Sequence, residues 1–226
     1  MPGKKQSARI KRRVFIVDDH PLVRHGITQL INQQCDLVVC GQAGDAGCSV
    51  KCIAECKPDL VIVDICLKGA DGIQLIKQLR KQNSHLLLLV VSMHDESVYA
   101  ERVLRAGARG YVMKQEAAEE VIRAVRKIFN GEIAVSKRIT TQMLSRFLST
   151  GEELTRSGID ALTNRELQVF RLIGLGRRTR EIASELNLSI KTIEAYRENI
   201  KKKLGLGNTT ELTVRAAQWI SGEQGV

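Results

Sequence analysis

The chain has 226 residues, which is enough for one large domain or two modest ones. Apolar residues make up 43% of it and aromatic residues only 4%, so we expect cores of Leu, Ile, Val and Ala. The longest apolar run, Leu86–Val91, is far below the roughly 18 residues of a membrane span, and Val14–Val17 is too short for a signal-peptide core. These lengths favour a soluble, cytoplasmic protein without a membrane partner.

The net charge of +10 is distributed unevenly. Residues 1–12 are expected to form a basic tail, and the first 13 residues carry +6 without an acid. Residues 14–160 are neutral, and residues 161–226 carry +4. Excess positive charge near the C-terminus suits a nucleic-acid phosphate backbone, although many solvated helices are mildly basic.

The first half of the sequence alternates predicted strands with predicted helices. Apolar runs of strand length occupy residues 14–18, 37–41, 60–64, 86–92 and 110–113. Amphipathic helices are expected over about 21–33, 45–56, 72–82, 96–106 and 116–129. Nearly continuous apolar strands between such helices are typical of a parallel sheet covered on both faces. The predicted fold class is therefore α/β, with a five-stranded, parallel, doubly wound, flavodoxin-like domain over residues 13–130.

Six cysteines lie at positions 35, 40, 48, 52, 56 and 66. No two of them form a CxxC pair, which argues against a zinc module. Cys48, Cys52 and Cys56 would share one stripe of the second predicted helix. We expect buried thiols that pack as small hydrophobic groups, and a thiol metal or redox site is the less favoured interpretation.

The pattern changes after Gly131. Residues 131–160 are polar, with one expected helix near 137–148, and we interpret them as a linker. Residues 161–226 show only helical periods, with helices expected over about 164–175, 179–186, 190–204 and 209–221. Thr163 and Glu166 are spaced as a capping box, between Leu162 and Leu167 as a hydrophobic staple. The second domain is therefore predicted to be an all-α, four-helix unit.

Three acids stand where predicted strands end. Asp18 and Asp19 end the first strand, and Asp64 ends the third. Because the carboxyl ends of parallel strands meet at one edge of a doubly wound sheet, we expect these side chains to converge. Close carboxylates repel one another unless a cation neutralises them, and Mg²⁺ is the natural partner for oxygen ligands. The alternative is that the three acids simply face solvent.

Two more strand ends complete the predicted pocket. The fourth strand ends in Ser92, and Lys114 follows the fifth. A metal ion and Lys114 would neutralise the oxygens of a phosphoryl group, and Ser92 would donate a hydrogen bond to it. Asp64 would then be the nucleophile that forms an acyl phosphate.

With these residues, 13–129 resemble the receiver domain of a response regulator. The matching segments are Asp18-Asp19, Asp64, Gly69-Ala70-Asp71-Gly72, Ser92 and Gly110-Tyr111-Val112-Met113-Lys114. The runs 18–24 and 92–95 are similar to the NarL/FixJ type in particular. Lys68 departs from the pattern, since receivers commonly carry proline there.

The resemblance implies that Asp64 accepts phosphate from a sensor histidine kinase. It also implies that Asp19, Asp64 and the backbone carbonyl of Cys66 bind Mg²⁺, with Asp18 helping through water. Ser92 would move toward the phosphoryl group.

By the same resemblance, Tyr111 would rotate inward behind Ser92 as a switch. The alternative is that Tyr111 is a fixed, half-buried strand residue. The four histidines, at positions 20, 25, 85 and 94, are not spaced as a metal set, and we expect structural or surface roles for them.

Residues 179–198 match a helix, a tight turn and a second helix, which is the corner of a DNA-reading helix-turn-helix. Ile182 and Ala183 give the first helix a buried stripe. Asn187 suits a left-handed turn position, and Ser189 can cap the next helix.

The second helix of this corner divides by angle. Ile193, Ile200 and Leu204 should point inward with Tyr196 beside them, and the opposite face is the predicted groove face. The residues expected at DNA are Thr179, Lys191, Thr192, Glu194, Ala195, Arg197, Glu198, Lys201 and Lys202. Lys and Arg side chains on this face would hold phosphates, and Glu198 could accept a hydrogen bond from a cytosine amine. The alternative is an ordinary solvated face.

Residues 162–220 resemble a LuxR-type DNA-binding domain. The matching segments are Leu162–Glu166, Gly176, Glu181–Ala183, Leu188-Ser189, Lys191–Ile193 and Lys203–Gly205. The resemblance implies pairing through the helix near 209–221, hence a homodimer when active. Glu194 and Glu198 make the groove face less basic than in many relatives, so base preferences do not transfer.

Together these features predict a transcriptional regulator of a two-component system, in which phosphorylation of Asp64 controls binding to double-stranded operator DNA. It would not be an enzyme, apart from self-phosphorylation by small donors and self-dephosphorylation. One alternative is a constitutive DNA-binding regulator with an inert receiver. Another is a Mg²⁺-dependent phosphohydrolase, which would leave the helix-turn-helix without a role.

Overall fold

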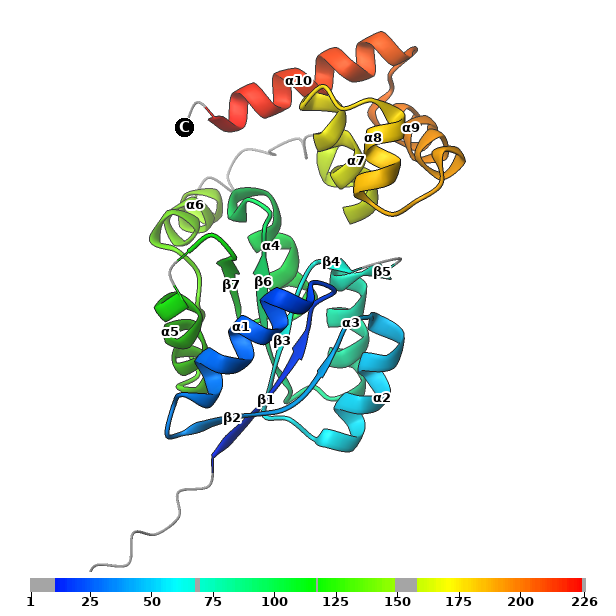
Figure 1. The fold of residues 1–226 in the computed structure, drawn as a ribbon. Helices are drawn as coiled ribbons and strands as arrows, with labels where there is room; N and C mark the ends of the chain where they lie inside the picture. The colour runs from blue at the N-terminus through cyan, green and yellow to red at the C-terminus, as the bar shows by residue number, and fades with distance from the viewer. Residues whose placement is uncertain (1–10, 68–69, 117, 149–157, 225–226) are drawn as a thin grey trace, which may run out of the picture. The chain divides into compact units, whose positions relative to one another are not determined.

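The computed structural model describes residues 11–67, 70–116, 118–148 and 158–224 (Figure 1). The chain divides into two compact units, Met1–Phe147 and Leu148–Val226, and each unit is described by itself. The division falls inside the segment 131–160 that the sequence predicts to be a linker. Within the described ranges, no helix is long and apolar enough to cross a membrane.

The first unit is built on a parallel sheet of five strands in the order β2-β1-β3-β6-β7. The strands are β1 Arg12–Val17, β2 Leu37–Ala43, β3 Leu60–Val63, β6 Leu87–Ser92 and β7 Gly110–Met113. All four neighbouring pairs run parallel. The predicted doubly wound α/β class is therefore confirmed.

Five helices cover this sheet (Figure 1). One face carries α1 (Pro21–Asn32) and α5 (Ala118–Phe129), and the other carries α2 (Ala46–Cys56), α3 (Gly72–Gln82) and α4 (Glu96–Ala106). Short polar residues set the helix starts, because Asp45, Asp71 and Asp95 each accept a hydrogen bond from a backbone N–H in the first turn. Pro21 opens α1 with a backbone angle already suited to a helix.

Strand residues on both faces of the sheet are buried in the core of the first unit. Val14 and Ile16 of β1 and Ile62 of β3 are at most 1% exposed and pack with Ile31 of α1 and Val125 of α5. Intervening strand residues are equally buried, which explains why the strands read as continuous apolar runs. Burial of each such side chain contributes roughly 1.5–3 kcal/mol.

The structure adds local features that the sequence did not predict. A short antiparallel ribbon, β4 (Cys66–Leu67) with β5 (Ala70–Asp71), follows β3. The predicted turn residue Gly69 and the unusual Lys68 lie outside the described residues. After α5 the chain returns to the sheet edge, where Ala134 forms a parallel bridge with Gly110. It then enters α6 (Lys137–Leu148), over the range where a linker helix was expected.

The second unit is helical, as predicted. Its elements are η1 Gly158–Ala161, α7 Asn164–Gly174, α8 Thr179–Glu185, α9 Ile190–Leu204 and α10 Thr209–Gln224. The capping box is confirmed, because the N–H of Thr163 donates to Glu166 Oε2 at 2.7 Å and the N–H of Glu166 donates to Thr163 Oγ1 at 3.3 Å. The core joins α7 to α10, where the rings of Phe170 and Trp219 lie 5.5 Å apart between centroids.

All six cysteines are free thiols. The expectation that they are buried is wrong for Cys35 and Cys48, which are exposed, and the other four are half-buried. On α2, Ser49 and Ile53 form the buried face. The stripe of Cys48, Cys52 and Cys56 is therefore rotated by one residue, about 100°, away from the centre of that face.

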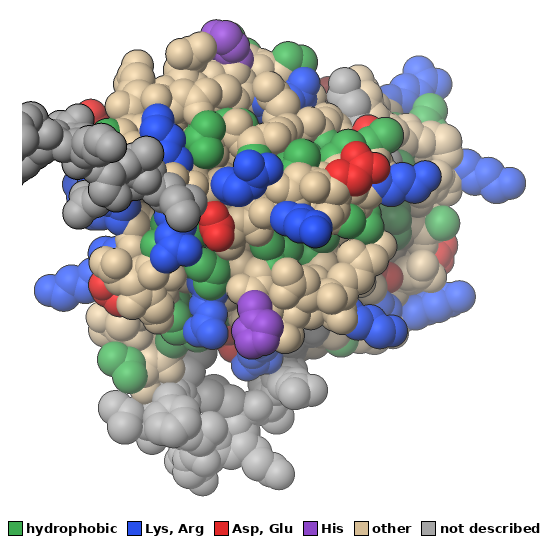
Figure 2. Space-filling view, turned by 90° about the horizontal axis from the view of Figure 1, so that it is seen from below, with side chains coloured by type: hydrophobic (Ala, Val, Ile, Leu, Met, Phe, Trp, Pro, Cys, Tyr) green, Lys and Arg blue, Asp and Glu red, His purple; other side chains and the backbone are tan. Residues whose placement is uncertain are grey.

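Charged side chains on the face of the molecule shown in Figure 2 stand apart from one another. Lys and Arg residues are spread among polar and hydrophobic groups, and the visible acids are scattered. This dispersed arrangement contrasts with the carboxylates that meet at the strand ends.

Candidate functional site

Three predicted pocket residues meet at the carboxyl edge of the sheet. Val17 pairs with Val63, so Asp18 and Asp64 leave neighbouring strands side by side. Lys114 follows β7, and its Nζ lies 2.6 Å from Asp18 Oδ2 and 2.6 Å from Asp64 Oδ2. The side chains of these three residues are 2–4% exposed. The structure thus holds one buried ammonium between two buried carboxylates.

Asp19 brings a third carboxylate to the same place. Asp18, Asp19, His20 and Asp64 each offer a possible ligand atom, and these atoms lie within 4.8 Å of one another. Asp19 Oδ1 is buried without a hydrogen-bond donor among the described residues, although His20 Nδ1 lies 2.7 Å from it. Sequence reasoning placed His20 among structural or surface residues and missed this position, which its place directly after the acidic pair could have signalled.

The electrostatics of the pocket favour a further cation. Burial raises the pKa of Asp64, and the charge of Lys114 opposes that rise. Burial alone would lower the pKa of Lys114, but Asp64 and Asp18 more than compensate and raise it. Three carboxylates therefore face one buried ammonium, which leaves an excess of negative charge.

The donor set fits a hard divalent ion. Carboxylate oxygens from Asp18, Asp19 and Asp64 are the ligands that Mg²⁺ prefers, and Asp19 Oδ1, beside the exposed His20 ring, accepts no hydrogen bond among the described residues. Cys66, whose carbonyl was expected as a ligand, lies in the loop after Asp64, and its N–H donates to Asp64 Oδ1 at 3.2 Å.

Close packing fixes this loop. A Cβ atom on Gly72 would lie only 2.1 Å from the backbone oxygen of Asp64, so the start of α3 approaches Asp64 as near as a glycine permits. The N–H of Gly72 donates to the carbonyl of Ile65 at 2.9 Å. Asp64 is therefore held by backbone contacts on both sides of its own residue.

The predicted switch residues lie behind the pocket. Ser92 is fully buried, and the N–H of His94 donates to its Oγ at 3.4 Å. Tyr111 is 2% exposed, so it is buried rather than half-buried, and its hydroxyl donates to the carbonyl of His94 at 2.8 Å. Burial raises the pKa of Tyr111, which keeps its hydroxyl a donor. Tyr111 is thus a buried strand residue, and the switch role expected of it stays a prediction.

His94 has a structural role, as expected, but through contacts that the sequence did not predict. Its Nε2 lies 2.7 Å from Cys66 Sγ, and its ring centroid lies 5.0 Å from that of Tyr99 on α4. Together with its backbone bonds to Ser92 and Tyr111, it connects the loop after β3, the end of β6, β7 and α4. No sequence spacing signals such a residue, because its partners come from four separate elements.

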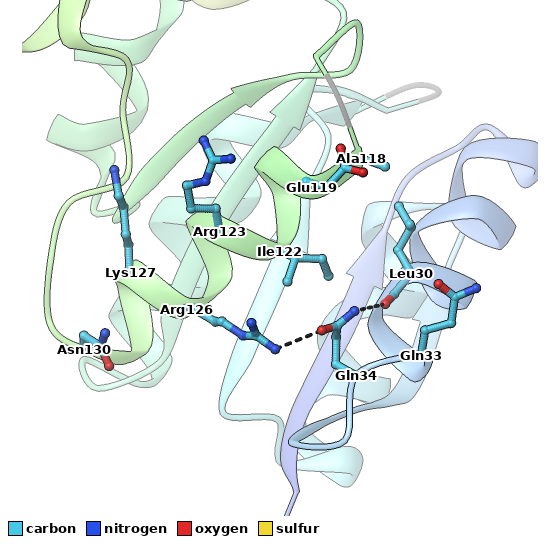
Figure 3. A pocket seen from close by; sticks show the side chains of 10 residues that line it. All are labelled: Leu30, Gln33, Gln34, Ala118, Glu119, Ile122, Arg123, Arg126, Lys127 and Asn130. Carbon is cyan, nitrogen blue, oxygen red and sulfur yellow. Dashed lines mark hydrogen bonds between the residues drawn. The ribbon is translucent and has the colours of Figure 1, made fainter.

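A different hollow lies between α1 and α5, with a volume of about 500 Å³ (Figure 3). Leu30 and Ile122 give it apolar walls. Arg126 points across it and donates to Gln34 Oε1 at 2.8 Å. Glu119 is the carboxylate that lines it, so it lacks the converging acids of the pocket at the strand ends.

The helix-turn-helix forms as predicted in the second unit. Ile182 and Ala183 of α8 are buried, and Asn187 takes the left-handed conformation at φ 52°. Ser189 caps α9 by accepting from the N–H of Thr192 at 3.0 Å.

The two faces of α9 separate as the helical angle requires. Ile193 and Ile200 are fully buried, and Tyr196 and Leu204 are half-buried. Of the residues expected at DNA, Lys191, Glu194, Ala195, Glu198 and Lys202 are exposed, and Thr179, Thr192, Arg197 and Lys201 are half-buried. Lys201 Nζ lies 2.8 Å from Glu198 Oε1, so these two side chains are paired.

Comparison with known proteins assigns both units to families. Residues 14–126 match the response regulator receiver domain, and residues 160–216 match the bacterial regulatory proteins of the luxR family. The oxygen regulatory protein NreC of Staphylococcus aureus is 33% identical over 204 residues, covering 88% of this chain and 94% of that protein.

Solved structures of RcsB are also similar. RcsB of Salmonella enterica serovar Typhimurium, bound to promoter rprA with the phosphomimetic BeF3−, gives a TM-score of 0.59 at 27% identity over 92% of this chain and 99% of that one. A structure of two RcsB dimers bound to two parallel DNAs gives a TM-score of 0.55 at 29% identity over 90% of this chain and 96% of that one.

Proposed function

Because this chain belongs to the two-component response regulators that join a receiver domain to a LuxR-type DNA-binding domain, we propose that Asp64 is its phosphoacceptor. Phosphorylation of Asp64 then controls DNA binding by the second unit. The observation that carries this assignment is the buried Asp64 carboxylate beside Asp18 and Lys114, with 2.6 Å from Lys114 Nζ to each acid.

The pocket supplies what phosphoryl transfer requires. An oxygen of Asp64 bonds to phosphorus while the bond to the donor, a histidine nitrogen of a sensor kinase, breaks. Lys114, which already contacts Asp64, then holds a phosphoryl oxygen, and the buried Ser92 hydroxyl donates to another. Asp19, Asp64 and the Cys66 carbonyl, with Asp18 helping through water, would hold Mg²⁺, which would supply positive charge to neutralise phosphoryl oxygens. Tyr111 fills the space behind Ser92 as the switch.

The same pocket accounts for the limited chemistry expected of the chain. Asp64 takes phosphate from small phosphodonors and loses it to water, and we assign the protein no further enzymatic activity. Residues 13–130 form the receiver, 131–160 the linker and 161–226 the DNA-binding domain, after a basic tail over 1–12. The protein acts in the cytoplasm, where a kinase and DNA are both within reach.

Basic side chains of α9 support the DNA-binding role. Its outer face carries Lys191, Arg197, Lys201 and Lys202 against Glu194 and Glu198, a net positive charge suited to phosphates. The RcsB relatives bind DNA, in one structure as dimers. By that likeness the active form is a homodimer on double-stranded operator DNA, with half-sites about one helical turn apart.

One pair of variants tests the phosphoacceptor. Full-length wild type incubated with acetyl phosphate and Mg²⁺ should shift on a phosphate-affinity gel, and Asp64→Asn should abolish that shift. Asp45→Asn is the matched control, because Asp45 is exposed and asparagine caps a helix equally well. A shift retained in Asp64→Asn would refute the assignment.

A DNA-binding measurement separates the alternatives. A duplex recovered by phosphorylated wild type from a random library should bind more tightly with acetyl phosphate than without it. Equal affinity in both states would favour a constitutive binder with an inert receiver. Sustained turnover of a phosphomonoester would favour a phosphohydrolase.

A further inference from the structure

The segment after α5 is fastened to the edge of the sheet. The N–H of Tyr111 donates to the carbonyl of Ala134 at 2.8 Å, and the N–H of Ala134 donates to the carbonyl of Arg109 at 2.9 Å. A Cβ atom on Gly110 would lie 2.7 Å from the Ala134 oxygen, so only glycine permits this approach. The strand that carries the switch tyrosine is thereby bonded directly to the beginning of the linker.

The linker helix α6 starts three residues after Ala134, at Lys137, and Ser136 has two roles there. Its Oγ accepts from the N–H of Ile139 at 3.2 Å, which caps α6, and it donates to Glu96 Oε1 at 2.6 Å. Ile139 is 2% exposed and anchors the first turn. Arg138 Nη2 lies 3.8 Å from Asp95 Oδ1 between half-exposed side chains, a contact that adds little.

Glu96 is an unusual acceptor for this bond. It is the first residue of α4, it is only 9% exposed, and it is followed by an ordinary amphipathic helix. Burial raises the pKa of the nearby Glu116, and the charges of Glu96 and Glu120 raise it further, so the surroundings are rich in acids. The Ser136 hydroxyl therefore supplies a hydrogen-bond donor to a carboxylate that burial largely removes from water.

We propose that the Ser136–Glu96 hydrogen bond is a latch through which the phosphorylation state of Asp64 reaches the linker and the DNA-binding domain. The proposal rests on the function proposed above. Ser92 ends β6 and Glu96 begins α4 four residues later, so a displacement of Ser92 toward a phosphoryl group pulls on the latch through the loop between them. Tyr111 reaches the linker from the other side, because its hydroxyl holds His94 while its N–H holds Ala134.

Reversing the polarity of the latch separates this role from helix capping. Ser136→Asp keeps a side chain that caps α6 but cannot donate to Glu96, and it adds charge beside an acid. Glu96→Gln still accepts from Ser136. In the double variant, the glutamine amide donates to the aspartate and rebuilds the bond in the opposite direction.

The readout is the ratio of DNA affinities with and without acetyl phosphate and Mg²⁺, measured for full-length protein on the duplex selected with wild type. Ser136→Asp should reduce this ratio to about one while the gel shift of phosphorylated protein persists. Glu96→Gln and the double variant should keep the wild-type ratio. Thr141→Asp, an exposed α6 site one turn further along, is the charge control and should also keep it.

Two results would overturn the latch: a wild-type ratio in Ser136→Asp, or a double variant that stays at the value of Ser136→Asp. The persisting gel shift shows that the receiver remains folded and phosphorylated in the variants. A wild type that is phosphorylated but has a ratio of one defeats the proposed function itself, and the latch with it.

Discussion

Removing the buried ammonium tests the pocket most directly. In Lys114→Met the side chain keeps its approximate length, but Asp18 and Asp64 lose the contact that each makes at 2.6 Å. Two carboxylates that are 2–3% exposed are then left beside a third, Asp19, without a fixed cation. Breaking a buried ion pair by removing one partner costs about 3–5 kcal/mol of unfolding free energy. We expect a loss of that order at neutral pH without divalent ions.

Proton uptake by Asp64 limits this loss, and the sign is fixed by the direction of its pKa. Burial already raises the pKa of Asp64, and removing Lys114 takes away the main opposing effect. A carboxyl whose folded pKa is raised favours folding at low pH, and that contribution is lost as pH rises through the folded pKa. Lys114→Met should therefore be less destabilised at mildly acidic pH than at neutral pH.

Magnesium should restore what the ammonium supplied. A ligand at about 100 times its Kd stabilises the folded state by about 2.7 kcal/mol. Because the variant pocket has lost its only ammonium within the described residues, Mg²⁺ should stabilise Lys114→Met more than wild type. Urea unfolding followed by circular dichroism, with and without Mg²⁺, measures the loss of stability and its recovery. Lys51→Met, at an exposed position on α2, is the control. Equal stability of Lys114→Met and Lys51→Met without Mg²⁺ would refute the buried triad.

Three further changes have defined outcomes. Tyr111→Phe removes the bond to the His94 carbonyl and should cost about 1 kcal/mol in urea unfolding, with phosphorylation retained but the phosphate-dependent gain in DNA affinity reduced. Gly110→Ala forces a Cβ to within 2.7 Å of the Ala134 oxygen and should cost about 1–3 kcal/mol by the same measurement. Glu166→Ala loses its capping bond and a 2.6 Å contact with Lys203 Nζ, and should cost the second unit about 2–4 kcal/mol. The single tryptophan, Trp219, lies in that unit and reports its unfolding. The pKa of Glu166 is lowered because bonds to Lys203 and Thr163 outweigh its burial, so this contribution should vanish as pH falls through the acidic range.

Sequence reasoning succeeds where function follows from the ends of regular elements. Continuous apolar runs identify the strands, and parallel strands place their last residues at one edge. Asp18, Asp64 and Lys114 could therefore be brought together from their positions alone, and the structure does so. The buried stripe of α9 is equally accessible, because the period of a helix decides that Ile193 and Ile200 share a face.

The same reasoning fails where a residue's role depends on contacts between irregular segments. His94 has no spacing that links it to Cys66 or Tyr111, and its contacts follow from how loops fold beside the pocket. The cysteines of α2 were misjudged for a smaller reason: a rotation of one residue moves Cys48 from the buried face to the surface. Local patterns define a helix face only to within about one residue.

The loop between β6 and α4 explains how one short segment can serve both the pocket and the linker. Ser92 is buried at the end of β6, the His94 backbone bonds Ser92 and Tyr111, and Glu96 bonds Ser136. These residues alternate along the chain, and within five positions their side chains and backbone groups bond to Tyr111 on β7 and to Ser136 before α6. A shift of Ser92 is passed along this segment in the proposed relay, because His94 is bonded to Tyr111 and Glu96 to Ser136. In the proposed relay, the loop would carry a charge change at Asp64 to the start of α6 through these bonds.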